Sequence, residues 1–124
     1  MEGYLATIIE TSKVLTARER LMVKDTSNAN SIDELTQTSA LVISPKDYAV
    51  VDIHNDKSDN KDYRKYIIFD ESGNKYVTGS ASFWEAFKDI FDEMKGEECE
   101  YSIEIYRIES KNYKGKSFIT CSII

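Results

Sequence analysis

Two runs near the C-terminal end of the chain alternate between apolar and polar side chains. Residues Glu100–Ile108 and Phe118–Ile124 carry β-branched or aromatic side chains at alternate positions, which is the period of a half-buried β-strand. The loop between them, Ser110–Ser117, holds three lysines, one tyrosine and one glycine. The pattern predicts a β-hairpin with a basic connecting loop, a form that suits nucleic-acid binding.

A second hairpin is predicted in the middle of the chain. Residues 64–70 and 75–79 read as strands, and Glu71–Asn74 between them contains the Gly-Asn pair that a tight turn with positive φ requires. Upstream, the apolar runs 40–43 and 48–53 are interrupted by Pro45, which cannot donate a ladder hydrogen bond. These two runs predict either one long bent strand or two short strands.

The N-terminal part of the chain predicts short elements. We expect a strand over Tyr4–Glu10, and over Ala17–Val23 a short helix capped by Thr16 with Glu19 at the third helical position. Ser31–Glu34 is a second capping box that predicts one or two helical turns.

One long helix is predicted to follow residue 81. Ser82–Glu85 has the form of a capping box, and Gly96 offers a left-handed stop. Apolar side chains recur behind the cap at three- and four-residue spacing, and we assign this stripe to the core. Trp84 lies off the centre of the stripe, so we expect it either at the edge of the core or partly exposed. The stripe consists of Phe83, Phe87, Ile90, Phe91 and Met94.

The order of elements predicts the fold class. From residue 40 it runs strand, polar loop, hairpin, helix, hairpin, which is the order of a five-stranded OB barrel with its helix between the third and fourth strands. We predict a mainly β, α+β protein with an OB-like barrel whose loops 54–63 and 109–117 flank the ligand face. Residues 1–38 are then an N-terminal extension packed on the barrel, and 39–124 the OB-like domain, in a single globular unit.

Charge is segregated along this acidic chain. The 124 residues contain 16 Lys and Arg against 22 Asp and Glu, a net charge of −6. The segment Glu85–Glu100 has a net charge of −5, whereas Tyr101–Ile124 has Arg107, Lys111, Lys114 and Lys116 against Glu104 and Glu109, a net charge of +2. A local basic face can attract a polyanion although the total charge is negative.

Composition argues against several other classes. The first residues lack the features of a signal peptide and no apolar run approaches ~20 residues, so we expect a soluble cytoplasmic protein. We expect Cys99 and Cys121 to be free thiols, because their spacing matches no metal or redox motif. The only histidine, His54, lies in a polar loop near Asp52 and Asp56, where it could act as a base or metal ligand but is more often neither. No catalytic or metal motif is complete, so we predict no enzyme activity and no cofactor.

Tyrosines beside basic residues are the candidate binding groups. Binding of single strands without sequence preference needs cations for phosphate and flat side chains for base stacking. Strand tyrosines, Tyr66, Tyr76, Tyr101 and Tyr106, equally fit ordinary sheet positions, whereas tyrosines in polar loops have less core to enter. The candidate nucleic-acid-binding residues are Tyr63, Arg64, Lys65, Tyr106, Arg107, Lys111, Tyr113, Lys114 and Lys116.

A second basic cluster lies on or after the short N-terminal helix. Arg18, Arg20 and Lys24 either extend the binding path or pair with Glu19 and Asp25. We favour the pairing.

The second half of the chain resembles a known family. The run Tyr66–Tyr76, the Ser80–Ser82 start of a helix containing Asp89-Ile90, and the loop Ser110–Gly115 before a last apolar strand resemble small single-stranded-DNA-binding proteins of phages of Gram-positive bacteria, the phi29-type group in particular. The resemblance covers roughly residues 64–124. It implies coating of replicating single-stranded DNA without sequence preference and without catalysis. A homodimer or a replication-protein partner is compatible with this role. The N-terminal 38 residues and the aromatic-rich helix depart from that pattern.

Two other classes stay open. The net charge of −6 suits a small phage-encoded protein-binding module or inhibitor that acts through an acidic surface. The apolar end Ser122–Ile124 would suit an oligomerising protein, or would complete the barrel.

Overall fold

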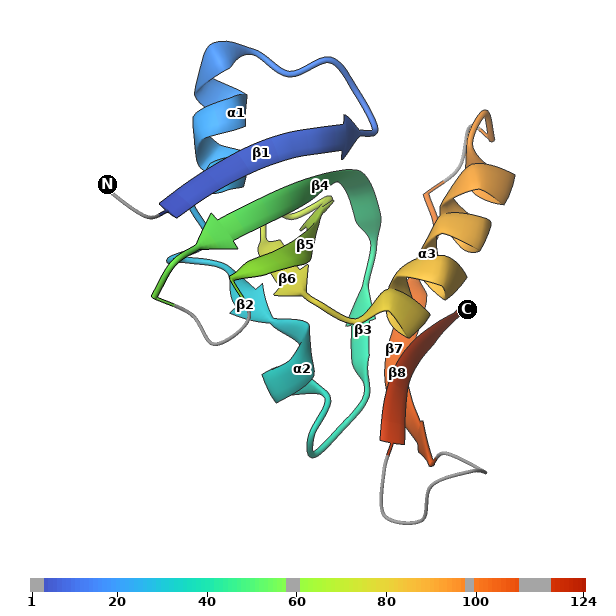
Figure 1. The fold of residues 1–124 in the computed structure, drawn as a ribbon. Helices are drawn as coiled ribbons and strands as arrows, with labels where there is room; N and C mark the ends of the chain where they lie inside the picture. The colour runs from blue at the N-terminus through green and yellow to red at the C-terminus, as the bar shows by residue number, and fades with distance from the viewer. Residues whose placement is uncertain (1–3, 58–60, 98–99, 110–116) are drawn as a thin grey trace. The chain divides into compact units, whose positions relative to one another are not determined.

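The computed structural model describes residues 4–57, 61–97, 100–109 and 117–124. Strands dominate the described chain, and one long helix, α3, lies between β6 and β7 in the sequence (Figure 1). This confirms the prediction of a mainly β, α+β protein. The strands form two separate sheets, neither of which closes on itself, so closure into a barrel is not confirmed.

The larger sheet has the strand order β1-β4-β5-β6-β2. Strand β4 contributes strongly to the core, because every residue from Tyr48 to Ile53 except Asp52 is buried, as the apolar run 48–53 predicts. β1 pairs antiparallel with β4, and a β-bulge lies between Ile8 and Glu10. The predicted hairpin is confirmed as β5 paired with β6, with Gly73 at a φ of +88° in the turn. The strands are β1 (Tyr4–Thr11), β2 (Asn30–Ser31), β4 (Pro45–Asn55), β5 (Asp62–Asp70) and β6 (Lys75–Thr78).

Helix α1 (Ala17–Lys24) packs on one face of this sheet. The predicted capping box is confirmed: the Glu19 backbone N–H donates to Thr16 Oγ1, and the Thr16 N–H donates to Glu19 Oε1. Val23 is the buried residue of the helix and joins the core formed by Ala49 and Ile67 among others. The helix and the sheet therefore share a core.

The smaller sheet has the order β3-β7-β8 and comprises β3 (Leu41–Ile43), β7 (Ile103–Glu109) and β8 (Ser117–Ile123). The predicted C-terminal hairpin is confirmed, with Glu109 opposite Ser117 at the end where the connecting segment begins and ends. The runs on either side of Pro45 are two strands, since β3 pairs with β7 and β4 belongs to the larger sheet. The short predicted helix is α2 (Ile32–Leu35), capped by Ser31.

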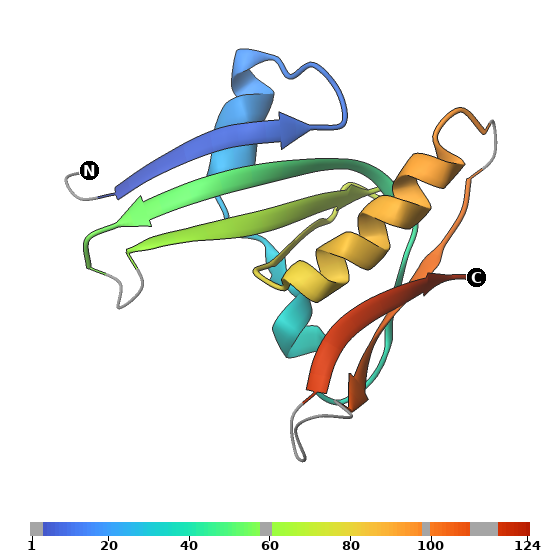
Figure 2. The ribbon, with the colours of Figure 1, turned by 45° about the vertical axis from the view of Figure 1, so that its right-hand side comes forward.

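Helix α3 (Ala81–Met94) packs on β8 (Figure 2). The predicted cap at Ser82 is wrong by two residues, because Ser80 is the N-cap and accepts from the Phe83 N–H. Ser82 instead donates to the Ile119 carbonyl oxygen on β8, at 3.0 Å. Trp84 is buried, with its ring centroid 5.1 Å from that of Phe87. The prediction that the stripe is core is confirmed for Phe83 and Phe87, which are buried, whereas Ile90, Phe91 and Met94 are half-buried.

The described contacts divide the chain into two units. The first comprises Met1–Asn30 and Lys46–Gly79, and the second Ser31–Pro45 and Ser80–Ile124. β1 and α1 are integral to the first unit, whereas α2 belongs to the second. The domain boundary expected at residue 38 stays a prediction. The two units divide instead after Asn30, after Pro45 and after Gly79.

Candidate nucleic-acid interface

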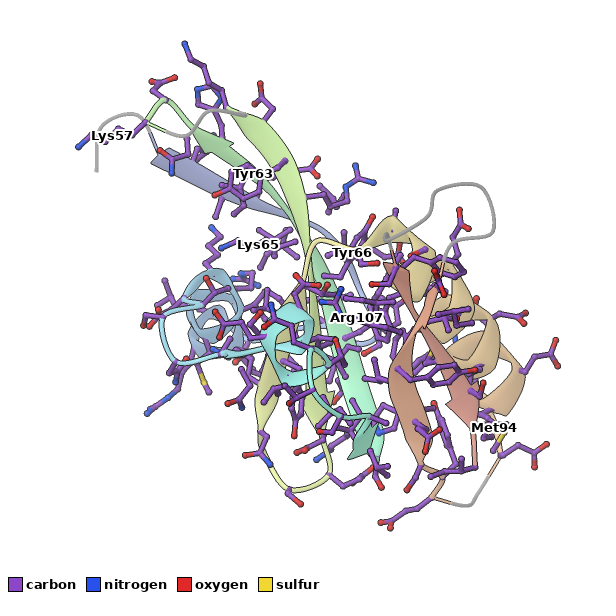
Figure 3. All side chains as sticks on the ribbon, turned by 90° about the horizontal axis from the view of Figure 1, so that it is seen from below. Lys57, Tyr63, Lys65, Tyr66, Met94 and Arg107 are labelled. Atoms are coloured by element: carbon purple, nitrogen blue, oxygen red, sulfur yellow. The ribbon has the colours of Figure 1, made fainter. Side chains whose placement is uncertain are left out.

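The candidate residues of β5 separate onto two faces of the larger sheet, because successive side chains of a strand point in opposite directions. Tyr63 packs against the core beneath α1, and the Lys65 Nζ lies 5.9 Å from the Tyr63 ring centroid (Figure 3). Arg64 turns to the other face, where its Nε donates to Asp52 Oδ1 at 2.7 Å. The structure thus brings together Tyr63 and Lys65 and separates them from Arg64.

A groove of about 450 Å³ lies beside Arg64. The Asp52 carboxylate raises the pKa of Arg64 and compensates its charge. Tyr66 lines the groove but is only 9% exposed. This groove is therefore a mixed-charge surface, in which the candidate residue Arg64 is paired with a carboxylate. Its lining residues are Leu5, Thr7, Asp52, Ile53, His54, Asp62, Tyr63, Arg64 and Tyr66.

His54 forms a bridge at one end of this groove. Its Nδ1 lies 2.8 Å from Asp62 Oδ1, and its Nε2 lies 2.8 Å from Asp56 Oδ1. These hydrogen bonds, that of Asp62 first, raise the pKa of His54 above its ordinary 6.5, since both carboxylates favour the imidazolium. The ring ties the end of β4 to the start of β5. Among the residues that the structure describes, no group of three or more acidic, Cys or His side chains could hold a metal ion.

The two candidate residues of β7, Tyr106 and Arg107, also lie on opposite faces of their sheet. Arg107 lies opposite Ile119 in the register, and its guanidinium donates to the Asp33 carbonyl oxygen at 2.7 Å and to Thr36 Oγ1 at 3.3 Å. A third, longer contact joins it to Ser117 Oγ, at 3.4 Å. These bonds tie α2 to the hairpin. All three acceptors are uncharged oxygen atoms, and they engage donors of the Arg107 guanidinium within the protein.

Tyr106 lies on the opposite face of the hairpin, which we call the outer face. Its hydroxyl lies 2.7 Å from Ser122 Oγ, which fixes the position of the ring. Phe118 and Ile108 face each other across the two strands on this same face, and each is 41% exposed. The outer face therefore presents one exposed aromatic ring, Phe118, on β8 and a half-buried one, Tyr106, on β7, the two strands that the basic segment joins.

Phe118 was not among the residues predicted to bind. The signal was present in the sequence, because Phe118 and Thr120 alternate with Ile119 and Cys121, and only one of the two sets can enter the core. The structure shows that Ile119 and Cys121 are the buried set.

Four candidate residues lie outside the described part of the chain. They are Lys111, Tyr113, Lys114 and Lys116, in the segment that joins β7 to β8. Their role in binding stays a prediction. Cys99 also lies outside the described residues, whereas Cys121 is a free, buried thiol whose pKa is raised to about 12 by desolvation.

Comparison of the chain with protein-family models, curated proteins and solved structures found no match. None of the helices in the described ranges is long and apolar enough to cross a membrane.

Proposed function

We propose that this protein binds single-stranded DNA without sequence preference, through the β7–β8 hairpin. The observation that carries the proposal is the outer face of that hairpin, where the half-buried Tyr106 and the exposed Phe118 lie on the two strands that the basic segment 110–116 joins. Stacking of a base on an aromatic ring contributes roughly 1–3 kcal/mol and tolerates any base. Phosphate contacts by lysines add an attraction that is independent of sequence.

The charges around the hairpin support this assignment. The sequence Arg107–Ser117 carries Arg107, Lys111, Lys114 and Lys116 against Glu109 alone, a net charge of +3 in a chain of net −6. A concentration of positive charge beside flat side chains suits a flexible strand whose bases are free to stack. Bases in a duplex are already stacked, so we expect a preference for single strands.

The OB-like part of the proposal rests on strand pairing. An OB barrel is a partly open, five-stranded structure, and the predicted order places a helix between its third and fourth strands. Here the chain pairs β4 with β5 and β5 with β6, continues through α3, and then pairs β7 with β8. The run β3–β4 that precedes β5 pairs with β7 through β3. This connectivity supports an OB-like arrangement with β1 and α1 as additions.

The biological setting follows from the resemblance to single-stranded-DNA-binding proteins of phages. We propose a role in phage DNA replication in the cytoplasm of the bacterial host, with no catalysis by this chain. A homodimer or a contact with a replication protein is compatible with that role.

Fluorescence anisotropy of a labelled single-stranded oligonucleotide tests the proposal. We expect binding that weakens as salt is raised and that an unlabelled duplex of the same sequence competes for poorly. Absence of binding at low salt would overturn the proposal. Equal competition by the duplex would overturn the preference for single strands.

The acidic alternative predicts a different result. A protein-binding module that mimics nucleic acid needs a continuous array of carboxylates, and the net charge of −6 favours this class. On α3, however, Lys88 interrupts the acidic face and its Nζ lies 3.2 Å from Asp92 Oδ1. Such a module would bind no oligonucleotide at any salt concentration.

A further inference from the structure

The acidic residues of α1 are occupied by partners other than the cations of that helix. Glu19 Oε2 lies 2.9 Å from the Lys13 Nζ, and Glu19 Oε1 accepts from the Thr16 N–H at 3.0 Å. Asp25, just after the helix, accepts from both the backbone N–H and the hydroxyl of Ser27. The pairing expected from the sequence between these two acids and the cations of α1 is therefore not formed.

Three cations are left exposed on and near α1. Within the described ranges of the chain, no ion pair involves Arg18, Arg20 or Lys24. Arg20 and Lys24 are four residues apart and so lie on the same side of the helix. Arg20 is held in place by a hydrogen bond from its Nη1 to the Leu15 carbonyl oxygen, at 3.0 Å.

Strand β5 adds a fourth cation and a tyrosine beside the end of the helix. The Lys65 Nζ donates to Thr26 Oγ1 at 3.2 Å, two residues past the end of α1. Tyr63 lies next to Lys65 on the same face of the sheet, as Figure 3 shows. Both side chains are half-buried, which limits their freedom and reduces the entropic cost of ordering them when a ligand binds.

The orientation of α1 is set by its core contact. Val23 is 1% exposed and packs among core residues of the sheet, including Ala49 and Ile53. Because Val23 points inward, its neighbours Met22 and Leu21 are left 51% and 69% exposed. Arg20 and Lys24 thus stand in water beside apolar side chains, an arrangement that suits contact with both the phosphates and the sugars of a nucleic acid.

We propose that Arg20, Lys24, Lys65 and Tyr63, which we call the α1 surface, form a second contact with the phosphate backbone of single-stranded DNA. This inference rests on the proposed function and adds a binding surface in the first unit to the hairpin of the second. A polyanion is the ligand because the surface presents several cations and, among the described residues, no compensating carboxylate pairs with them. Tyr63 lies beside Lys65 in this surface and packs against the core.

The salt dependence of binding tests the proposal. For single strands, the slope of log K against log salt concentration changes by about 0.7 for each phosphate that the protein neutralises. We expect Arg20→Ala with Lys24→Ala to reduce the slope by about 1.4, and Lys65→Met to reduce it by about 0.7. Lys88→Ala with Lys95→Ala removes two cations on and just after α3, outside both surfaces, and serves as the matched control, with no change in slope expected.

The outcomes separate this inference from the proposed function. If wild-type protein binds the oligonucleotide and the Arg20, Lys24 double variant keeps the wild-type slope, the α1 surface is overturned and the hairpin proposal stands. If wild-type protein binds no oligonucleotide, both are overturned. A thermal unfolding curve unchanged from wild type shows that the double variant is folded, as the exposure of both side chains leads us to expect.

Discussion

Arg64 on β5 and Asp52 on β4 form a hydrogen-bonded ion pair, with 2.7 Å between the Arg64 Nε and Asp52 Oδ1. Both side chains are about half exposed, at 50% and 47%. The pair compensates the one cation of the Tyr63–Tyr66 run that lies on this face. Strand alternation therefore places the two cations of this run on opposite faces of the sheet. Arg64 is paired with a carboxylate on one face, and Lys65 lies beside Tyr63 on the other.

Substitution of Arg64 is expected to have little effect on DNA binding. In Arg64→Ala the affinity for single-stranded DNA should stay within about twofold of wild type, since the guanidinium of Arg64 already donates to Asp52 and makes no phosphate contact in this account. Anisotropy titrations at two salt concentrations would measure this. A reduction in slope by about 0.7, the value for one phosphate contact, would show that Arg64 leaves Asp52 to bind DNA.

Removal of the exposed ring of Phe118 is expected to weaken binding. We expect Phe118→Ala to cost about 1–3 kcal/mol of binding free energy, the usual contribution of one stacked base, with an unchanged salt slope. Phe118→Trp should retain affinity because it keeps a flat side chain. Ile108→Ala, at the equally exposed position opposite Phe118, is the control for general damage to the hairpin. Equal reductions in affinity for the two alanine variants would argue against stacking.

His54 is expected to make stability depend on pH near neutrality. Because Asp62 and Asp56 raise its folded-state pKa above 6.5, its contribution to stability is fully present below about pH 6.5 and is lost as pH rises through the raised value. The unfolding free energy should fall across that window in wild type and less steeply in His54→Gln. Urea denaturation at several pH values, with an NMR titration of the single histidine, would measure both. A titration midpoint below 6.5 would contradict the bridge.

Lys75 is expected to stabilise the end of α1. Its Nζ is close to the carbonyl oxygens of Met22 and Asp25, at 2.6 and 2.8 Å, and the residue is only 8% exposed. Lys75→Met would leave these acceptors without that donor, at a cost of roughly 1–3 kcal/mol of unfolding free energy. Chemical denaturation would measure the decrease, with the exposed Lys95→Met as control. Equal stability of the two variants would mean that water replaces the ammonium group.

Local patterns predicted most of the elements, because each depends on neighbours in sequence. Both hairpins follow from period-two alternation, and α3 follows from its aromatic stripe. The error at Ser82 has a non-local cause: Ser80 and Ser82 both suit an N-cap, and the bond from Ser82 to the Ile119 carbonyl oxygen, 37 residues away, leaves Ser80 as the cap.

The candidate site was harder to predict for similar reasons. The separation of Tyr106 from Arg107 follows from strand alternation and could have been predicted. The engagement of Arg107 by Asp33 and Thr36 could not, because it depends on where α2 packs. The partner of Glu19 was also missed, since Lys13 lies outside the helix and reaches back across its cap.

The most direct measurement is the salt dependence of single-stranded DNA binding by a hairpin variant. We predict that Lys114→Glu with Lys116→Glu weakens binding and reduces the slope of log K against log salt by at least about 1.4. Lys88→Glu with Lys95→Glu makes the same change in net charge on and just after α3, outside both proposed surfaces, and should leave the slope near wild type. Identical slopes for the two variants would contradict the central claim that the β7–β8 hairpin binds the strand.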